Sequence, residues 1–428
     1  MQKAAVYLID IALIFIMNAF LMNLPITISI ISSLIIYLGI YSFRTYDTET
    51  MKSYTESLIK TTVGTLVSFI VILIIYFFLS KYFNRYFFLT NLLYTIALLP
   101  IIHKIEYNIY EKHMPVKNYL VIGRKEEIGN IMEEISEKAL NKIKFTQYIN
   151  PNPVTLDEII KQNTQKTLTQ TIHGIVITDP ELEERVKPQI QNYKAEGLEI
   201  QYLPNLVDRY LKRIPIEVIE KHEDYYKMIF EGSRTSPMIR ICDIIFSLIL
   251  LVISSPFILA SMIVILIDDV IHKEKIEIFF KQKRVGQNGK IFRVYKLKTM
   301  RRITNSNGEK IDVLTKTGKF LRKFRLNEFP QLLNVIKGDL SLVGPRPDIE
   351  STIPFCEENI PFYNYRTKVP QGITGHAQVF FRYPEALTKE IYSERLSYDL
   401  YYVKNYSLML YIATLLRTVE TVIMGRGE

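Results

Sequence analysis

The stretch with the most chemical potential is residues 326–347, which bring an acid, a short apolar pattern and an arginine together. Glu328 offers a carboxylate that could bind a hard divalent cation. Arg346 stands between Pro345 and Pro347, whose rings fix φ, so we expect a rigidly held guanidinium suited to two phosphate oxygens. A surface helix followed by a proline-rich loop explains the same residues equally well.

A short helix is predicted inside this stretch. Pro330 fits a first helical turn, where its missing N–H costs nothing, and Leu332, Leu333 and Ile336 follow at helical spacing. Gly338 is expected to end the helix.

The sequence LNEFPQLLNVIKGDLSLVGPRP at 326–347 resembles the signature of the bacterial sugar transferases, the monotopic phosphoglycosyl transferases. Further similar motifs are SSPF at 254–257, FRVYKLKTM at 292–300, GKFLRK at 318–323, PQGITGHAQV at 370–379 and YDLYYVKNYSL at 398–408. The resemblance covers residues 237–428. With its membrane helices and middle domain, the whole chain is similar to the long polyprenyl-phosphate hexose-1-phosphate transferase subclass.

The resemblance implies an enzyme that transfers a sugar 1-phosphate from a nucleotide sugar, expected to be a UDP sugar, to polyprenyl (undecaprenyl) phosphate. This would be the first membrane step of exopolysaccharide, capsule or O-antigen synthesis. Mg²⁺ is the implied cofactor, and the partners are the lipid phosphate, the nucleotide sugar and the membrane. The sequence specifies neither the sugar nor whether the chain forms a homo-oligomer.

The resemblance also assigns roles to individual residues. Glu328 is expected to bind Mg²⁺, and Asp399 either to bind it or to orient the acid that does. The other expected catalytic residues are Lys296, Arg346 and Asn327, and the expected substrate-binding residues are Arg322, Arg346, Arg382 and Lys298. Judged on spacing alone, Lys296 and Lys298 are better explained as solvated lysines of a basic run.

Asn327 departs from the family pattern, in which an aspartate that forms a covalent phosphosugar intermediate commonly precedes the glutamate. An amide is a poor nucleophile. Three explanations fit an active protein: Glu328 attacks, the lipid phosphate attacks directly, or Asn327 is an altered aspartate. The alternative is a catalytically impaired, membrane-anchored scaffold or regulator of the same pathway.

Basic charge is concentrated in residues 273–325, which hold 17 Lys and Arg against 4 Asp and Glu. Such an excess suits pyrophosphate, anionic lipid or nucleic acid. The segment interleaves strand-like apolar residues and has no nucleic-acid recognition motif, so we do not expect nucleic acid as a partner.

The composition, 48% hydrophobic with a mean hydropathy of +0.09, is high for a soluble protein. Four apolar runs approach the length needed to cross a bilayer: 4–24, 26–43, 65–83 and 86–105. They predict a four-helix transmembrane domain over 1–110. Basic residues in the 44–64 loop and after the fourth run place both ends of this domain in the cytoplasm. We therefore expect a multi-pass inner-membrane protein with its catalytic domain on the cytoplasmic face.

Few residues outside the catalytic motifs suggest chemistry of their own. Asp10 lies inside the first apolar run and is a functional candidate, although a neighbour or interfacial water could equally satisfy it. Cys242 and Cys356 show neither metal-ligand spacing nor a disulfide framework, which indicates reducing surroundings. The six histidines show no metal spacing, and His376 is expected to be structural.

Residues 118–205 alternate short apolar runs with polar helical stretches, which predicts a Rossmann-like α/β domain with a parallel sheet. The expected strands are 119–122, 145–149, 174–178 and 198–203. After the first strand, Lys125 replaces the second glycine of a dinucleotide-binding turn, so a fold relic or interaction domain is favoured over a nucleotide site. Residues 206–236 are predicted to form a polar linker.

Residues 241–267 are apolar and long enough to span a bilayer, but Ser255 and Pro256 interrupt them. A crossing would export the basic 273–325 segment, contrary to the positive-inside rule. Proline breaks the helical hydrogen-bond ladder, and serine hydroxyls can satisfy the freed carbonyls. We predict a re-entrant hairpin that enters and leaves by one leaflet and belongs to a mixed α/β catalytic domain over 237–428.

Overall fold

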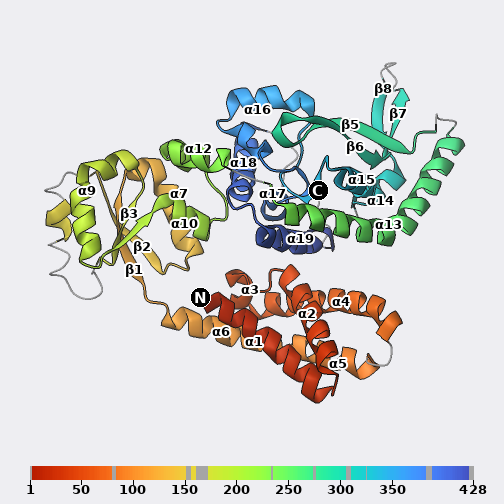
Figure 1. The fold of residues 1–428 in the computed structure, drawn as a ribbon, viewed down its shortest axis with the longest axis horizontal. Coiled ribbons are helices and arrows are strands. Elements are labelled where there is room, and N and C mark those ends of the chain that lie inside the picture. Colours follow the sequence, from red (N-terminus) through yellow and green to blue (C-terminus); the bar gives the residue numbers. More distant parts are fainter. Residues whose placement is uncertain are drawn as a thin grey trace. The chain divides into compact units, whose positions relative to one another are not determined.

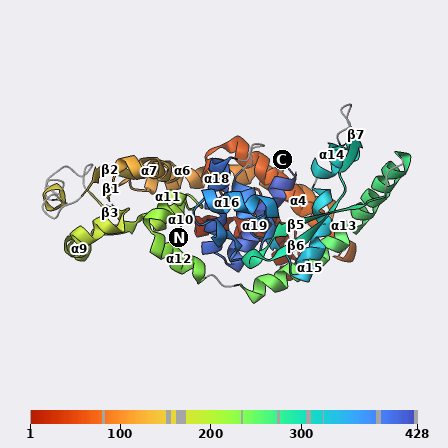
Figure 2. The same cartoon turned by 90° about the horizontal axis from the view of Figure 1, so that it is seen from above.

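The computed structural model describes residues 2–79, 83–150, 156–160, 172–232, 235–272, 276–304, 310–323, 325–381 and 388–423. The chain divides into two compact units, which are treated separately (Figures 1 and 2). Unit 1 comprises Met1–Met114 and Ile412–Gly427, and unit 2 comprises Pro115–Tyr411. The segment Ile412–Gly427 therefore groups with the N-terminal helices, whereas the sequence analysis places it in the catalytic domain.

Unit 1 is helical. Its N-terminal elements are α1 (Gln2–Ile16), a π-helical continuation (Met17–Leu21), α2 (Ile26–Ser42), α3 (Thr48–Lys52), α4 (Tyr54–Leu79), α5 (Arg85–Leu93), a second π-helical segment (Tyr94–Leu98) and α6 (Leu99–His113). Tyr54–Ile75 and Arg85–His113 are long and apolar enough to cross a membrane, while Val6–Leu21 and Ile26–Ser42 are shorter apolar helices. Helices form over most of the described residues of each predicted run, and the third helix begins at Tyr54 rather than at residue 65.

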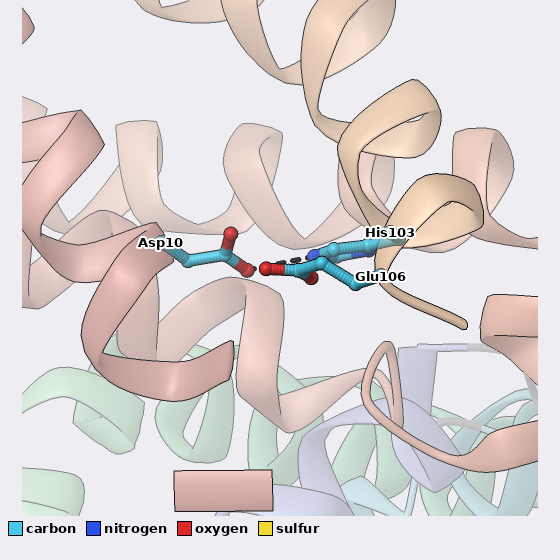
Figure 3. A group of neighbouring side chains, drawn as sticks. All are labelled: Asp10, His103 and Glu106. Carbon is cyan, nitrogen blue, oxygen red and sulfur yellow. Dashed lines mark hydrogen bonds and ion pairs between the residues drawn. The ribbon is translucent and has the colours of Figure 1, made fainter. Parts of the chain in front are cut away.

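Small and polar residues bring the helices of unit 1 together. A Cβ on Gly39 of α2 would lie 2.5 Å from the carbonyl oxygen of Gly64 in α4, so the two backbones touch there. The Asn91 amide donates to Asn18 Oδ1 at 2.9 Å. Another buried polar group, formed by Asp10, His103 and Glu106, lies between α1 and α6 (Figure 3).

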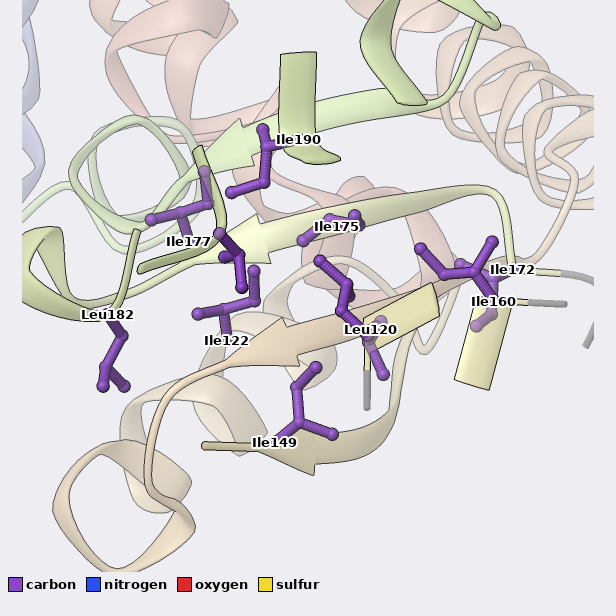
Figure 4. Packing of buried hydrophobic residues seen from close by; sticks show 11 residues of the cluster. Leu120, Ile122, Ile149, Ile160, Ile172, Ile175, Ile177, Leu182 and Ile190 are labelled. Carbon is purple, nitrogen blue, oxygen red and sulfur yellow. The ribbon is translucent and has the colours of Figure 1, made fainter. Parts of the chain in front are cut away.

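Unit 2 begins with the predicted parallel sheet, in the order β2-β1-β3-β4 (Figure 4). Its strands are β1 (Lys117–Ile122), β2 (Ile143–Ile149), β3 (Gly174–Ile177) and β4 (Glu199–Tyr202), connected in part by α7 (Lys125–Lys138) and α9 (Pro180–Ala195). Leu120, Ile122, Ile175 and Ile177 are fully buried, as expected for strands covered on both faces. The structure thus confirms a parallel α/β region.

The segment predicted to be a polar linker contains α10 (Leu203–Tyr210), α11 (Ile216–Lys221) and α12 (Glu223–Glu231). Tyr226 and Phe230, one helical turn apart on α12, are both fully buried. The Phe230 ring lies 5.1 Å from that of Tyr365. A few large aromatic side chains at helical spacing outweigh the polar composition.

Helix α13 (Pro237–Ile271) has 35 residues, is long and apolar enough to cross a membrane, and changes direction along its length in Figure 1. Pro256 removes the N–H that would bond the Val252 carbonyl, and Ser255 Oγ donates to that oxygen at 2.8 Å. The expected serine compensation is therefore present, although the helical assignment continues through the proline.

The rest of unit 2 consists of short elements. The hairpin strands β5 (Phe279–Val285) and β6 (Ile291–Leu297) pair antiparallel, as do β7 (Met300–Thr304) and β8 (Lys310–Leu314), while β9 (Ser341–Val343) pairs in parallel with β10 (Gly372–Thr374). The helices are α14 (Lys316–Lys323), α15 (Leu332–Lys337), α16 (Ile353–Asn359), α17 (His376–Phe380), α18 (Lys389–Lys404) and α19 (Leu408–Ile423). Tyr411 within α19 is the last residue of unit 2.

The predicted helix in 326–347 forms in two parts. A 3₁₀ turn, Leu326–Gln331, contains Pro330, and α15 follows it directly. Gly338 ends α15 with φ of +92°, a backbone conformation that glycine adopts without steric cost.

Candidate active site

The Glu328 carboxylate is buried among basic side chains from three separate elements. Lys296 Nζ, at the end of β6, lies 2.9 Å from Glu328 Oε1, and Arg346 Nη2, in the loop after β9, lies 3.1 Å from the same oxygen. Arg325 Nη1 lies 3.8 Å from Oε2. The structure therefore brings together three of the predicted catalytic residues: Lys296, Glu328 and Arg346.

Charge is unbalanced in this cluster, with three cations around one carboxylate. Burial alone would raise the pKa of Glu328, but Arg346 and Lys296 outweigh it and hold that pKa well below its ordinary value. Burial lowers the pKa of Lys296, and the neighbouring Glu328 only partly opposes this. An additional anion would relieve the excess positive charge, so the site is suited to bind phosphate groups.

Arg284, on β5, is a further cation that the sequence analysis missed. Its Nη1 donates to the Pro347 carbonyl at 3.0 Å. Burial, followed by the charge of Arg346, lowers the pKa of Arg284 to about 10, so it remains protonated at neutral pH. Its place in a run of basic residues gave no signal that distinguished it from its solvated neighbours.

Two arginine side chains hold the backbone carbonyl group of Arg346 in place. Its carbonyl oxygen accepts hydrogen bonds from Arg366 Nη2 and Arg395 Nη2, each at 2.7 Å. Asp348 and Asp399 hold these two guanidinium groups in turn: Arg395 Nη1 lies 2.8 Å from Asp348 Oδ1, and Arg366 Nη2 lies 2.8 Å from Asp399 Oδ2. Arg346 is therefore held both by the prolines on either side of it and by these hydrogen bonds to its carbonyl oxygen.

The direct metal-ligand role expected for Asp399 does not fit this geometry. Its carboxylate is 1% exposed and accepts from both Nε and Nη2 of Arg366, at 3.0 and 2.8 Å. In the part of the chain that the structure describes, no cluster of three metal-ligand donors includes Asp399 or Glu328. The other expected role, orientation, has a physical route through Arg366 and the Arg346 carbonyl.

The remaining predicted binding residues lie apart from the Glu328 cluster or have other partners. Lys298 Nζ pairs with the buried Asp269 of α13 at 2.7 Å. This ion pair connects the residue after β6 to the end of α13. Arg322 Nε donates to Thr299 Oγ1 at 3.1 Å. Arg382 lies outside the described residues.

Asn327 is buried beside Glu328 on the same 3₁₀ turn. Its amide makes no hydrogen bond with another described residue. Among the described residues, no hydrogen-bond partner therefore explains an amide at this position.

In the parallel α/β region, side chains from α11 and the residue after it contact residues near the carboxyl ends of the strands. Lys221 forms ion pairs with Glu127 and, at 3.8 Å, with Asp179. His222 Nε2 lies 3.2 Å from the carbonyl oxygen of Thr178, at the carboxyl end of β3. These contacts lie at the end of the sheet where many α/β folds bind ligands, and a fold relic or interaction domain stays a prediction.

Fold and site together describe a chain with helices apolar and long enough to cross a membrane and a buried carboxylate surrounded by lysine and arginine. Comparison with known proteins matches residues 234–425 to the bacterial sugar transferase family. The chain belongs to this family, which confirms the resemblance seen in the sequence.

Three relatives illustrate the similarity. UDP-N-acetylgalactosamine-undecaprenyl-phosphate N-acetylgalactosaminephosphotransferase of Aeromonas hydrophila is 32% identical over 217 residues, 50% of each chain. The uncharacterized sugar transferase EpsL of Bacillus subtilis is 42% identical over 153 residues, 35% of this chain and 72% of EpsL. UDP-glucose:undecaprenyl-phosphate glucose-1-phosphate transferase of Klebsiella pneumoniae is 36% identical over 185 residues, 42% of this chain and 39% of the relative. The match thus spans about half of the Aeromonas relative and less of the Klebsiella relative.

Proposed function

We propose that the protein transfers a sugar 1-phosphate from a UDP sugar to undecaprenyl phosphate. The observation that carries this proposal is the buried Glu328 carboxylate with Lys296, Arg346 and Arg325 around it. Such a site suits a substrate with several phosphate charges. The Aeromonas and Klebsiella relatives are named for this class of reaction, one with an N-acetylgalactosamine and one with a glucose donor.

The chemistry follows from these charges. Arg346 and Lys296 donate to the diphosphate oxygens of the UDP sugar and lower the repulsion that an incoming lipid phosphate meets. An oxygen of undecaprenyl phosphate attacks the phosphorus that carries the sugar, and the bond from this phosphorus to UMP breaks. The products are an undecaprenyl diphosphate sugar and UMP. Because Asn327 is an amide, we propose direct transfer without a covalent enzyme intermediate.

Glu328 fits as the protein ligand of a Mg²⁺ ion. Its Oε2 accepts no hydrogen bond from a described residue, since the nearest cation, Arg325 Nη1, is 3.8 Å away. Mg²⁺ is commonly held by one or two carboxylates together with substrate phosphates and water. The bound ion would neutralise phosphate charge, while Lys296 and Arg346 position the oxygens.

The first prediction is that Arg346→Lys lowers kcat/KM by roughly 10- to 100-fold. Lysine keeps the positive charge but loses the planar two-point fork, and a charge-assisted hydrogen bond contributes about 1.5–3 kcal/mol. The measurement is UMP release at several UDP-sugar concentrations. Arg302→Lys is the matched control, because Arg302 is exposed and pairs locally with Asp312, at 3.1 Å. Similar small losses in both variants would rule out a phosphate clamp at Arg346.

We further propose that α13 enters and leaves the membrane on the cytoplasmic side. Near its start, Arg240 Nη1 donates to the Val335 carbonyl of α15. Near its end, Asp268 and Asp269 pair with Arg301 at 2.6 Å and Lys298 at 2.7 Å. Both ends of α13 thus contact the same domain, which supports a re-entrant path over a crossing.

Cysteine labelling tests this topology. With Ile276→Cys, beyond the end of α13, an impermeant maleimide should react only after cells are opened. Adding Pro256→Leu should increase labelling in intact cells, because the straightened helix can cross. Tyr86→Cys, near the start of α5, is the control that should react in intact cells, because the connection between the third and fourth apolar runs lies outside when both ends of the four-span domain are cytoplasmic. Labelling of the Ile276→Cys protein in intact cells, with Pro256 present, would contradict the hairpin.

The proposed activity is tested with the purified full chain, Mg²⁺, undecaprenyl phosphate and a panel of UDP sugars. We expect UMP release together with a lipid-linked product for at least one sugar. Asn327 favours one specific alternative, a catalytically impaired scaffold or regulator. If folded protein gives neither product with any sugar, this alternative replaces the proposed enzyme.

A further inference from the structure

A second cluster of ionisable side chains lies in unit 1, separate from the Glu328 site. Asp10 projects from α1, and His103 and Glu106 project from α6 toward it (Figure 3). One donor atom from each of the three lies within 4.8 Å of the others. His103 Nε2 is 2.7 Å from Asp10 Oδ2.

The two carboxylates in this cluster are poorly compensated. Asp10 is fully buried, and among the described residues neither its Oδ1 nor either carboxylate oxygen of Glu106 has a hydrogen-bond partner. In the described part of unit 1, no lysine or arginine pairs with either acid. Two buried carboxylates beside one imidazole are costly unless a cation or protons accompany them.

We propose that Asp10, His103 and Glu106 form a binding site for a divalent transition-metal ion such as Zn²⁺ or Mn²⁺. One imidazole nitrogen with carboxylate oxygens suits ions of this class, whereas Mg²⁺ and Ca²⁺ favour oxygen alone. His103 and Glu106 stand three residues apart, a spacing that directs both side chains to one helix face, as in metal sites of helical bundles.

A neighbouring serine fits the role of an outer partner for the imidazole. Ser57 Oγ lies 3.2 Å from His103 Nδ1. When Nε2 binds a metal, Nδ1 carries the proton and can donate it to this hydroxyl, which fixes the ring orientation. The ion would link α1 to α6, which are 93 residues apart at Asp10 and His103. Its role is structural, and it stabilises unit 1.

Cobalt binding tests the site in the full chain. The protein, stripped with a chelator and placed in nanodiscs, is titrated with Co²⁺ in excess Mg²⁺, which keeps the Glu328 site occupied by an oxygen-favouring ion. We expect one equivalent of Co²⁺ per chain with a visible absorption band of mixed nitrogen and oxygen coordination. At free Co²⁺ about 100-fold above Kd, the thermal midpoint of unit 1 should rise by roughly 5–10 °C.

Variants separate this site from adventitious binding. Glu106→Gln and Asp10→Asn should each abolish the band and the thermal shift, and Ser57→Ala should weaken Co²⁺ binding by about 10- to 100-fold. Asp47→Asn is the control, because Asp47 is an acid of the same unit that pairs with Arg417 at 3.2 Å. It should bind Co²⁺ like the unmodified chain.

Two results would overturn the metal site. One is the absence of stoichiometric Co²⁺ in the unmodified protein, accompanied by a thermal midpoint that changes with pH, which would show that protons compensate the carboxylates. The other is an unchanged band in Glu106→Gln, a nearly isosteric variant whose folding the thermal transition reports independently.

Discussion

Glu328→Gln is expected to lower turnover by roughly two to four decades. The amide cannot carry the charge that Lys296 and Arg346 now share, at 2.9 and 3.1 Å, and it is a poor ligand for Mg²⁺. Removing one member of a buried ion pair costs about 3–5 kcal/mol, which corresponds to two to four decades in rate if it falls on the transition state. UMP release and lipid-linked product measure the loss.

Variants at Asn327 distinguish the mechanism in the same assay. Asn327→Ala should keep part of the activity if the lipid phosphate attacks directly, because no bond to residue 327 forms. Asn327→Asp should allow a sugar phosphate to be trapped on the protein, detectable by intact mass after acid quenching. A trapped adduct on the chain with Asn327 would refute direct transfer.

The control for this series is Glu350→Gln. Glu350 is half-buried and pairs with Lys283 at 3.4 Å, outside the Glu328 cluster. The turnover of Glu350→Gln should stay close to that of the unmodified chain. An equal loss in Glu328→Gln and Glu350→Gln would mean that Glu328 has no special part in the reaction.

Arg366→Met should destabilise unit 2 by about 3–5 kcal/mol, a fall of roughly 6–20 °C in thermal midpoint. Arg366 is 1% exposed and pairs with both Asp348 and Asp399, so its loss leaves two buried carboxylates undercompensated. The Arg346 carbonyl also loses one of its two donors, and activity should fall with stability. Thermal unfolding of the protein in detergent measures the change.

The loss of stability in Arg366→Met should depend on pH in a defined direction. Burial alone would raise the pKa of Asp348, but Arg366 and Arg395 outweigh it and hold this pKa below its ordinary value. The stabilisation from ionised Asp348 is therefore present above pH about 4 and is lost as the pH falls through its folded-state pKa. The gap between Arg366→Met and the unmodified protein should be largest near neutral pH and shrink on acidification.

Arg302→Met serves as the control, because the exposed Arg302–Asp312 pair lies on the β7–β8 hairpin. Exposed ion pairs contribute little to stability. No measurable change in thermal midpoint is expected. An Arg366→Met protein as stable as this control would show that Asp348 and Asp399 find other compensation.

Local features of this protein were predictable from its sequence. Alternating apolar runs predicted the parallel sheet, and Gly338 marked the end of α15 because the left-handed conformation there favours glycine. The serine beside Pro256 bonds the carbonyl that the proline leaves free. Each of these depends on residues within a few positions of one another. Inside the predicted polar linker, by contrast, Phe230 packs against a distant ring, that of Tyr365, which no local pattern reveals.

Ion-pair partners were decided only by the tertiary structure. Sequence proximity could not reveal that Lys298 pairs with Asp269 or that Asp399 is enclosed by Arg366. Nor could it place Asp10 against His103 across 93 residues. A side chain's charge and reach follow from its type, but its partner depends on which elements pack together. Burial then determines the strength of the interaction. In a site without water, an unpaired charge destabilises the fold, and the attraction between paired charges is stronger than in solvent.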